Sequence, residues 1–123
     1  MNPDVRIADV WCSEKSGRLV TVVPASASRW KSTDDPRRDV FYRGVTGAVM
    51  NALAANFVRG RRLIERAGVR VGDVRETGKA STVKVLLIGG DTALCDTQDA
   101  AERFPLVDLA AMPLVVRDGK AVT

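Results

Sequence analysis

A long stripe of apolar residues is the feature that most constrains how this chain can fold. Between residues 36 and 67 apolar side chains recur every three or four positions, as on one face of an α-helix. Asp35 is a suitable N-cap, Pro36 suits the first turn and Gly68 suits the position after the last turn. The stripe consists of Phe41, Val45, Ala48, Val49, Ala52, Leu53, Phe57, Leu63, Ile64 and Ala67. We therefore expect one long amphipathic helix ending at Gly68.

Three glycines interrupt this stripe. Gly44, Gly47 and Gly60 each weaken a helix by about 1 kcal/mol relative to alanine. We expect a kink near Gly60 and a close approach of the helix to a sheet at Gly44 and Gly47.

Short β-branched and alternating runs lie on both sides of the expected helix. They predict strands at residues 5–11, 18–23, 69–75, 82–88 and 114–117. The run 82–88 is the most apolar, so we expect it to be the most buried strand. Asp118-Gly119 is a strong hairpin turn signal that leads into residues 120–122. Thr97 is a suitable cap for a short helix reaching about Phe104.

The predicted order of elements is ββαββαβ, which contains the βαββαβ order of a ferredoxin-like α/β plait. We therefore expect an α+β fold, with an extra N-terminal strand added to the plait. The chain has 123 residues, 46% of them apolar and 28% charged, as in ordinary soluble proteins. Residues 1–123 are expected to form a single α+β domain, in which residues 24–35 form a surface loop insertion.

Positive charge is concentrated in the first part of the chain. Residues 1–70 contain thirteen Lys and Arg against seven Asp and Glu, whereas residues 71–123 contain six against eight. An excess of this kind favours an acidic or polyanionic partner. The first functional hypothesis is therefore a small basic accessory protein that contacts nucleic acid, with an acidic protein as the other partner considered.

The candidate polyanion-binding residues lie in the loop and along the expected helix. Arg29 and Lys31 belong to the loop, and Arg37 and Arg38 to the first helical turn. Three further residues share one helical face by their spacing of three and four. These are Arg59, Arg62 and Arg66. The alternative interpretation is a solvated face on which arginine stems cover apolar surface.

A second candidate site is the turn that follows the apolar strand. Gly89, Gly90 and Asp91 would let a ligand approach the backbone closely, and Asp91, Asp96 and Asp99 have the oxygen atoms that Mg²⁺ prefers. Cys95 would lie before the short helix, where a thiol pKa is lowered. This pattern predicts a small-ligand or Mg-dependent enzyme domain. A tight turn explains the same residues without a ligand.

The chain contains no histidine, which excludes Ser-His-Asp and Cys-His nucleophile systems within it. Cys12 and Cys95 form no C-x-x-C pair, so we expect two free, buried thiols. The shortage of reactive groups favours a binding protein over an enzyme, and no cofactor is expected. No signal peptide or membrane span is recognised, so a cytoplasmic protein is expected.

A third hypothesis is a structural subunit of a homo-oligomer or a larger complex. The strand at residues 5–11 would offer an open sheet edge, and the tail at residues 106–116 would offer apolar surface.

Overall fold

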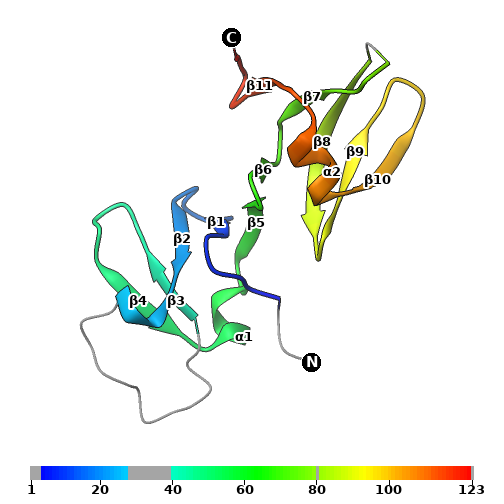
Figure 1. The fold of residues 1–123 in the computed structure, drawn as a ribbon. Helices are drawn as coiled ribbons and strands as arrows, with labels where there is room; N and C mark the ends of the chain where they lie inside the picture. The colour runs from blue at the N-terminus through cyan, green and yellow to red at the C-terminus, as the bar shows by residue number, and fades with distance from the viewer. Residues whose placement is uncertain (1–3, 28–39, 80, 123) are drawn as a thin grey trace. The chain divides into compact units, whose positions relative to one another are not determined.

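The computed structural model describes residues 4–27, 40–79 and 81–122 of the chain, and these residues form mainly β-strands (Figure 1). The strands form two six-stranded antiparallel sheets. The α-helices of the described residues are short, α1 at Ala54–Phe57 and α2 at Leu106–Ala111, and a 3₁₀ turn lies at Ala25–Ala27. The predicted α+β, ferredoxin-like plait is therefore wrong. No helix in this part of the chain has the length and apolar character needed to cross a bilayer.

The first sheet has the strand order β4-β3-β2-β1-β5-β6. Its strands are β1 (Val10–Ser13), β2 (Leu19–Val23), β3 (Val40–Arg43), β4 (Val49–Ala52), β5 (Arg61–Arg66) and β6 (Val69–Arg70). The second sheet has the order β10-β9-β8-β7-β11-β12. Its strands are β7 (Val74–Glu76), β8 (Thr82–Gly89), β9 (Thr92–Asp96), β10 (Ala101–Pro105), β11 (Leu114–Arg117) and β12 (Lys120–Ala121).

The chain divides into two compact units. Unit 1 is residues 1–63 and unit 2 is residues 64–123, so strand β5 crosses the boundary between them. Of the predicted surface loop at residues 24–35, positions 28–35 lie outside the described residues.

The predicted long helix is replaced by β3, β4, the four-residue helix α1 and β5. A spacing of four residues returns to the same face in a helix and also in a strand, so it does not distinguish the two. In β3 the burial alternates, because Val40 and Tyr42 are buried whereas Arg43 is exposed. Gly47 and Gly60 adopt φ values of +83° and +72°, which are left-handed and end any helix there.

The core of unit 1 is built on one face of its sheet. The predicted first hairpin is confirmed as β1 and β2, with β1 displaced from residues 5–11 to Val10–Ser13. The buried residues of this core are Trp11, Val22, Val40, Tyr42, Ala54 and Phe57. Phe57 lies in the centre, with ring centroids 5.6 Å from Trp11 and 5.1 Å from Tyr42. Helix α1 therefore covers the sheet by inserting one aromatic ring.

Strand β8 in unit 2 does not have the burial expected of it. Val83, Val85 and Ile88 are buried, but the intervening residues are exposed, and the register with β9 shifts between Val85 and Leu87. The bulge leaves Leu86 and Leu87 both exposed. The prediction that this is the most buried strand is wrong, because only one face of β8 contacts a core.

The end of the chain combines one correct and one wrong prediction. Thr97 does not cap a helix, because its hydroxyl donates to the carbonyl of Ala100 at 2.6 Å and accepts from the amide of Ala100 at 3.1 Å. The chain therefore turns back as strand β10. The final hairpin of β11 and β12 is confirmed, with Asp118 and Gly119 at φ values of +53° and +76°.

Candidate nucleic-acid interface

The excess of positive charge belongs to unit 1. Residues 1–63 contain eleven Lys and Arg against six Asp and Glu, whereas residues 64–123 contain eight against nine. The two units also differ in how their arginines are used, as the contacts below show. An anion-binding surface requires arginines that are not paired with carboxylates within the fold.

Unit 2 uses several arginines to surround the buried carboxylate of Asp73. Arg117 binds it in two places, with Nε donating to Oδ1 at 3.0 Å and Nη2 donating to Oδ2 at 2.9 Å. The same Oδ2 accepts from Nη2 of Arg75 at 3.2 Å and from the backbone amide of Arg70 at 3.0 Å. Burial raises the pKa of Asp73, but the hydrogen bonds from Arg117 and Arg70 outweigh it and hold that pKa below its ordinary 3.8.

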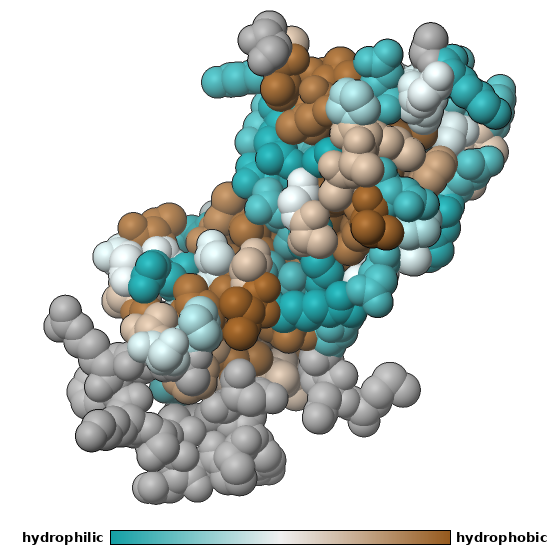
Figure 2. Space-filling view, in the orientation of Figure 1, coloured by the Kyte–Doolittle hydropathy of each residue, from teal (hydrophilic) through white to brown (hydrophobic). Residues whose placement is uncertain are grey.

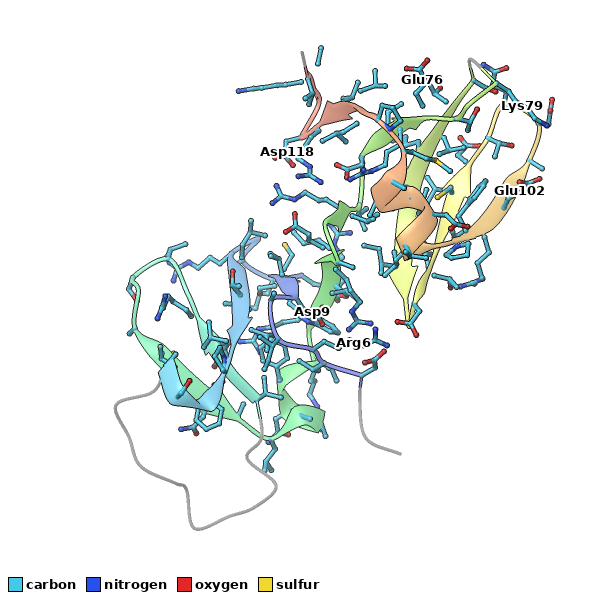
Figure 3. All side chains as sticks on the ribbon, viewed as in Figure 1. Arg6, Asp9, Glu76, Lys79, Glu102 and Asp118 are labelled. Atoms are coloured by element: carbon cyan, nitrogen blue, oxygen red, sulfur yellow. The ribbon has the colours of Figure 1, made fainter. Side chains whose placement is uncertain are left out.

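Further donors of these arginines bond within unit 2, although the buried Nε of Arg75 has no hydrogen-bond partner among the described residues. Nη1 of Arg75 donates to the carbonyls of Leu109 and Met112, which ties α2 to the sheet of unit 2. The side chain of Arg70 donates to Glu65 at 2.7 Å and to Asp118 at 2.8 Å. The position of Asp118 in the final turn is labelled in Figure 3. These arginines are structural, and we assign them no ligand.

In unit 1, by contrast, basic side chains gather at one end of the sheet. Antiparallel pairing places the β1–β2 turn, the β3–β4 turn and the start of β5 at the same end, and the amide of Glu14 donates to the carbonyl of Gly60 at 2.9 Å. Around this end lie six basic residues, which we call the basic turn surface. They are Lys15, Arg18, Arg43, Arg59, Arg61 and Arg62.

Carboxylates are almost absent from the three segments that form this surface. Glu14 is the one acidic residue in residues 13–19, 42–48 and 58–63. Lys15, Arg18, Arg43, Arg59 and Arg62 are exposed. Within the described part of the chain, none of these five side chains makes an ion pair. These five side chains therefore reach solvent, and no described carboxylate forms an ion pair with them.

A pocket of about 280 Å³ opens at this end of unit 1. Its walls combine two arginines, four hydroxyl side chains and several apolar side chains. The lining residues are Ser13, Ser16, Arg18, Leu19, Val20, Tyr42, Gly44, Val45, Thr46, Ala48, Met50 and Arg61. The apolar wall is open to solvent, since Val45 is 75% exposed and Met50 is 57% exposed. Figure 2 shows how apolar side chains reach the visible surface among hydrophilic ones.

Arg61 is held rigidly beside this pocket. Its Nη1 donates to the carbonyl of Phe57 at 2.9 Å. Its guanidinium carbon lies 5.1 Å from the ring centre of Tyr42 and 4.8 Å from that of Phe57. Cation–π contacts of this kind orient the guanidinium plane and leave its other donors available to a ligand.

A second pocket, of about 400 Å³, lies in unit 2 near the tips of its hairpins. Lys79 and Glu102, labelled in Figure 3, belong to its lining together with Phe104. The hydroxyl of Thr77 is already bonded to Ser81 at 3.2 Å, and that of Thr97 to Ala100. Because its charged side chains have both signs, Lys79 against Asp99 and Glu102, this pocket does not point to one class of ligand.

The structure separates the residues predicted to bind a polyanion. Arg29, Lys31, Arg37 and Arg38 lie outside the described residues. Arg59 and Arg62 are exposed, as expected, but they lie in a turn and on β5. Arg66 is only 3% exposed, and its Nη1 donates to the carbonyl of Gly90 at 3.0 Å. The shared helical face does not exist, because residues 61–66 form a strand.

The glycine turn at Gly89, Gly90 and Asp91 is the β8–β9 hairpin turn. Its carbonyls are bonded within unit 2, since Gly89 accepts from the Thr92 hydroxyl and Asp91 accepts from the amide of Leu106. Asp91 lies at one end of β9 and Asp96 at the other. Among the described residues, no three acidic, cysteine or histidine side chains are grouped to hold a metal ion. The turn interpretation accounts for these contacts.

Cys95 lies on β9 and is completely buried. The helix expected to begin after it is absent, because residues 101–105 form strand β10. Burial raises the pKa of its thiol, which disfavours the nucleophilic thiolate. Cys12 on β1 is partly exposed, and both cysteines are free. The prediction of two free thiols is confirmed, although Cys12 is less buried than expected.

This difference in burial predicts different reactivity of the two thiols. In the native protein we expect a thiol reagent to modify about one thiol per chain, at Cys12, and to modify both after unfolding. Titration with a chromogenic disulfide would measure this. The Cys12→Ser variant should be almost unreactive when native, and fast modification of that native variant would contradict the assignment.

No protein-family model, curated protein or solved structure matches this chain. The functional conclusion therefore depends on the geometry of the basic turn surface and its pocket.

Four residues of this surface were missed in the sequence analysis. They are Lys15, Arg18, Arg43 and Arg61. The signal that would have found them is their position within two residues of Gly17, Gly44 or Gly60, where glycines mark strand ends. Basic residues beside the turns of an antiparallel sheet lie at its ends. Because residues 36–67 were expected to form a helix, this grouping was not predicted.

Proposed function

We propose that this protein binds nucleic acid through the basic turn surface of unit 1. The observation that carries the proposal is the convergence of six basic side chains from three chain segments beside a single carboxylate. The arginines around Asp73 in unit 2 are, by contrast, paired with carboxylates within the fold. Unpaired guanidinium groups at a strand end are suited to the closely spaced charges of a phosphate backbone.

The arrangement also supports contact along a strand of phosphates. Arg61 and Arg18 line the pocket, whereas Arg62 follows Arg61 in β5 and so projects from the opposite face. Near the end of a strand, long arginine side chains from either face of the sheet can extend past the backbone, so both faces contribute cations to the same end. A flexible, evenly charged chain can follow such a curved surface, which favours nucleic acid over a folded acidic protein.

The proposal predicts a steep dependence of binding on salt. Fluorescence anisotropy with a labelled single-stranded oligonucleotide should give log K falling against log salt with a slope of about −4, if all six basic residues contact phosphates. The double variant Arg59→Glu/Arg62→Glu should flatten the slope by about 1 to 2. Both residues are exposed, so the change in folding stability should stay within about 0.5 kcal/mol for each.

The matched control changes the net charge equally in unit 2. Lys84 and Lys120 are exposed on β8 and β12, so Lys84→Glu/Lys120→Glu should leave the slope close to that of the wild type. Equal effects of the two double variants would assign the binding to net charge alone. Absence of any binding by micromolar protein at low salt would refute the proposal.

A further inference from the structure

The pocket at the basic turn surface has features that phosphate binding does not require. Phosphate contacts need exposed cations, but this pocket also has an apolar wall of Val20, Ala48 and Met50. Its hydroxyl groups come from Ser13, Ser16, Thr46 and Tyr42. The Ser13 and Ser16 hydroxyls each accept one backbone amide of the β1–β2 turn. A site with an apolar wall, a few hydroxyls and a cation is suited to a ligand that has a flat apolar face and polar edges.

Arg61 provides the surface on which such a ligand would stack. Its guanidinium carbon lies near the rings of Tyr42 and Phe57, and its Nη1 donates to the Phe57 carbonyl. Planar guanidinium groups stack on nucleic-acid bases as aromatic rings do. Within the described residues no carboxylate binds this guanidinium, so a base would not have to displace an internal ion pair.

The size of the pocket restricts the ligand to a single ring system. Its volume of about 280 Å³ lies at the lower limit of small-ligand sites, which hold roughly 300–1,000 Å³. A base can enter only when it is unstacked and unpaired, because bases in a duplex are covered on both faces. Arg18 lines the same pocket and is exposed, so it is available to the phosphate of the inserted nucleotide.

We propose that unit 1 is specific for single-stranded nucleic acid, and that it takes one unpaired base into this pocket against the guanidinium of Arg61. This inference rests on the proposed function, because the basic turn surface must first hold the phosphate backbone. It adds a preference for strand type that the charges alone do not explain.

The test compares three probes of equal length by fluorescence anisotropy. They are a single strand, its duplex, and a single strand with abasic sites that retains every phosphate. The wild-type protein should bind the single strand about tenfold more tightly than either of the other two. Arg61→Lys keeps the positive charge but removes the planar guanidinium group, so it should abolish this preference and leave the salt slope nearly unchanged.

A second variant tests the pocket independently, in case Arg61→Lys does not fold. Met50 is 57% exposed, so Met50→Glu should not disturb the core, but it places a carboxylate in the wall and should also abolish the preference. The matched control is Leu87→Glu, since Leu87 is 49% exposed in unit 2; it should retain the preference.

The outcomes separate the two proposals. Equal binding of all three probes, with a salt slope that Arg59→Glu/Arg62→Glu flattens, would overturn the base pocket and leave the proposed function standing. A wild-type preference that survives in both Arg61→Lys and Met50→Glu would also overturn the pocket. No binding of any probe would refute both proposals.

Discussion

Asp73→Asn should lower the free energy of unfolding of unit 2 by about 3–5 kcal/mol. Asp73 is fully buried and binds Arg117, Arg75 and the amide of Arg70. Asparagine removes the charge but leaves Arg75, itself buried, without its counter-ion. Breaking a buried ion pair from one side is costly because the remaining charge is not solvated. Hydrogen exchange of the β8 and β9 amides would measure the loss within unit 2.

The matched control is Asp118→Asn, which removes the same charge from an exposed position. The Asp118 side chain is 60% exposed and pairs with Arg70, so its loss should cost less than about 1 kcal/mol. If the two variants were equally stable, the network around Asp73 would not be the main support of unit 2.

The same carboxylate predicts how stability depends on pH. The native pKa of Asp73 lies below its ordinary 3.8, so its stabilising effect is complete above about pH 4 and is lost as the pH falls through the native pKa. The difference in unfolding free energy between wild type and Asp73→Asn should therefore shrink between about pH 6 and about pH 2. Denaturant titrations at the two pH values would measure it, and a constant difference would contradict the assignment.

Phe57→Ala should destabilise unit 1 by about 3–5 kcal/mol. Phe57 is 0% exposed and fills the space between Trp11 and Tyr42, so truncation leaves a cavity that two strands cannot close. The chain has two tryptophans, so denaturation of a Trp30→Phe background, followed by Trp11 fluorescence, would report on this core.

The control for this cavity is an exposed apolar residue of the same unit. Val45 is 75% exposed in the β3–β4 turn, so Val45→Ala should change the unfolding free energy by no more than about 0.5 kcal/mol. Similar costs for the two variants would show that Phe57 is not the centre of the unit 1 core. Phe57→Ala should also release Arg61, which stacks on the Phe57 ring.

Local turn chemistry was predicted well from the sequence. Asp118-Gly119 specified the final hairpin because both residues tolerate a positive φ. The first hairpin was predicted with its partner strands, although β1 begins at Val10 rather than Val5. These elements depend on residues close in the chain, so their signals are contained in short segments.

The prediction of a long helix was wrong because the spacing of its apolar residues is ambiguous and its three glycines disfavour a helix. Residues four apart share a face in a helix and also in a strand. Three glycines within one helix would together cost about 3 kcal/mol relative to alanine. Of the described residues in this stretch, 54–57 are helical, and α1 is stabilised by burying Phe57 on the sheet. The candidate site changed with the fold, because Arg66 moved from an expected surface into the interior.

The sequence by itself determined the positive bias of the first half, the absence of histidine and the hairpin turns, since these depend on composition or on neighbouring residues. Only the tertiary structure decided which arginines are free to bind. Arg75 and Arg117 are paired with Asp73, whereas Arg18 and Arg61 meet at a pocket from segments more than forty residues apart. The physical reason is that strand pairing brings distant residues together, and no local pattern in the chain records that pairing.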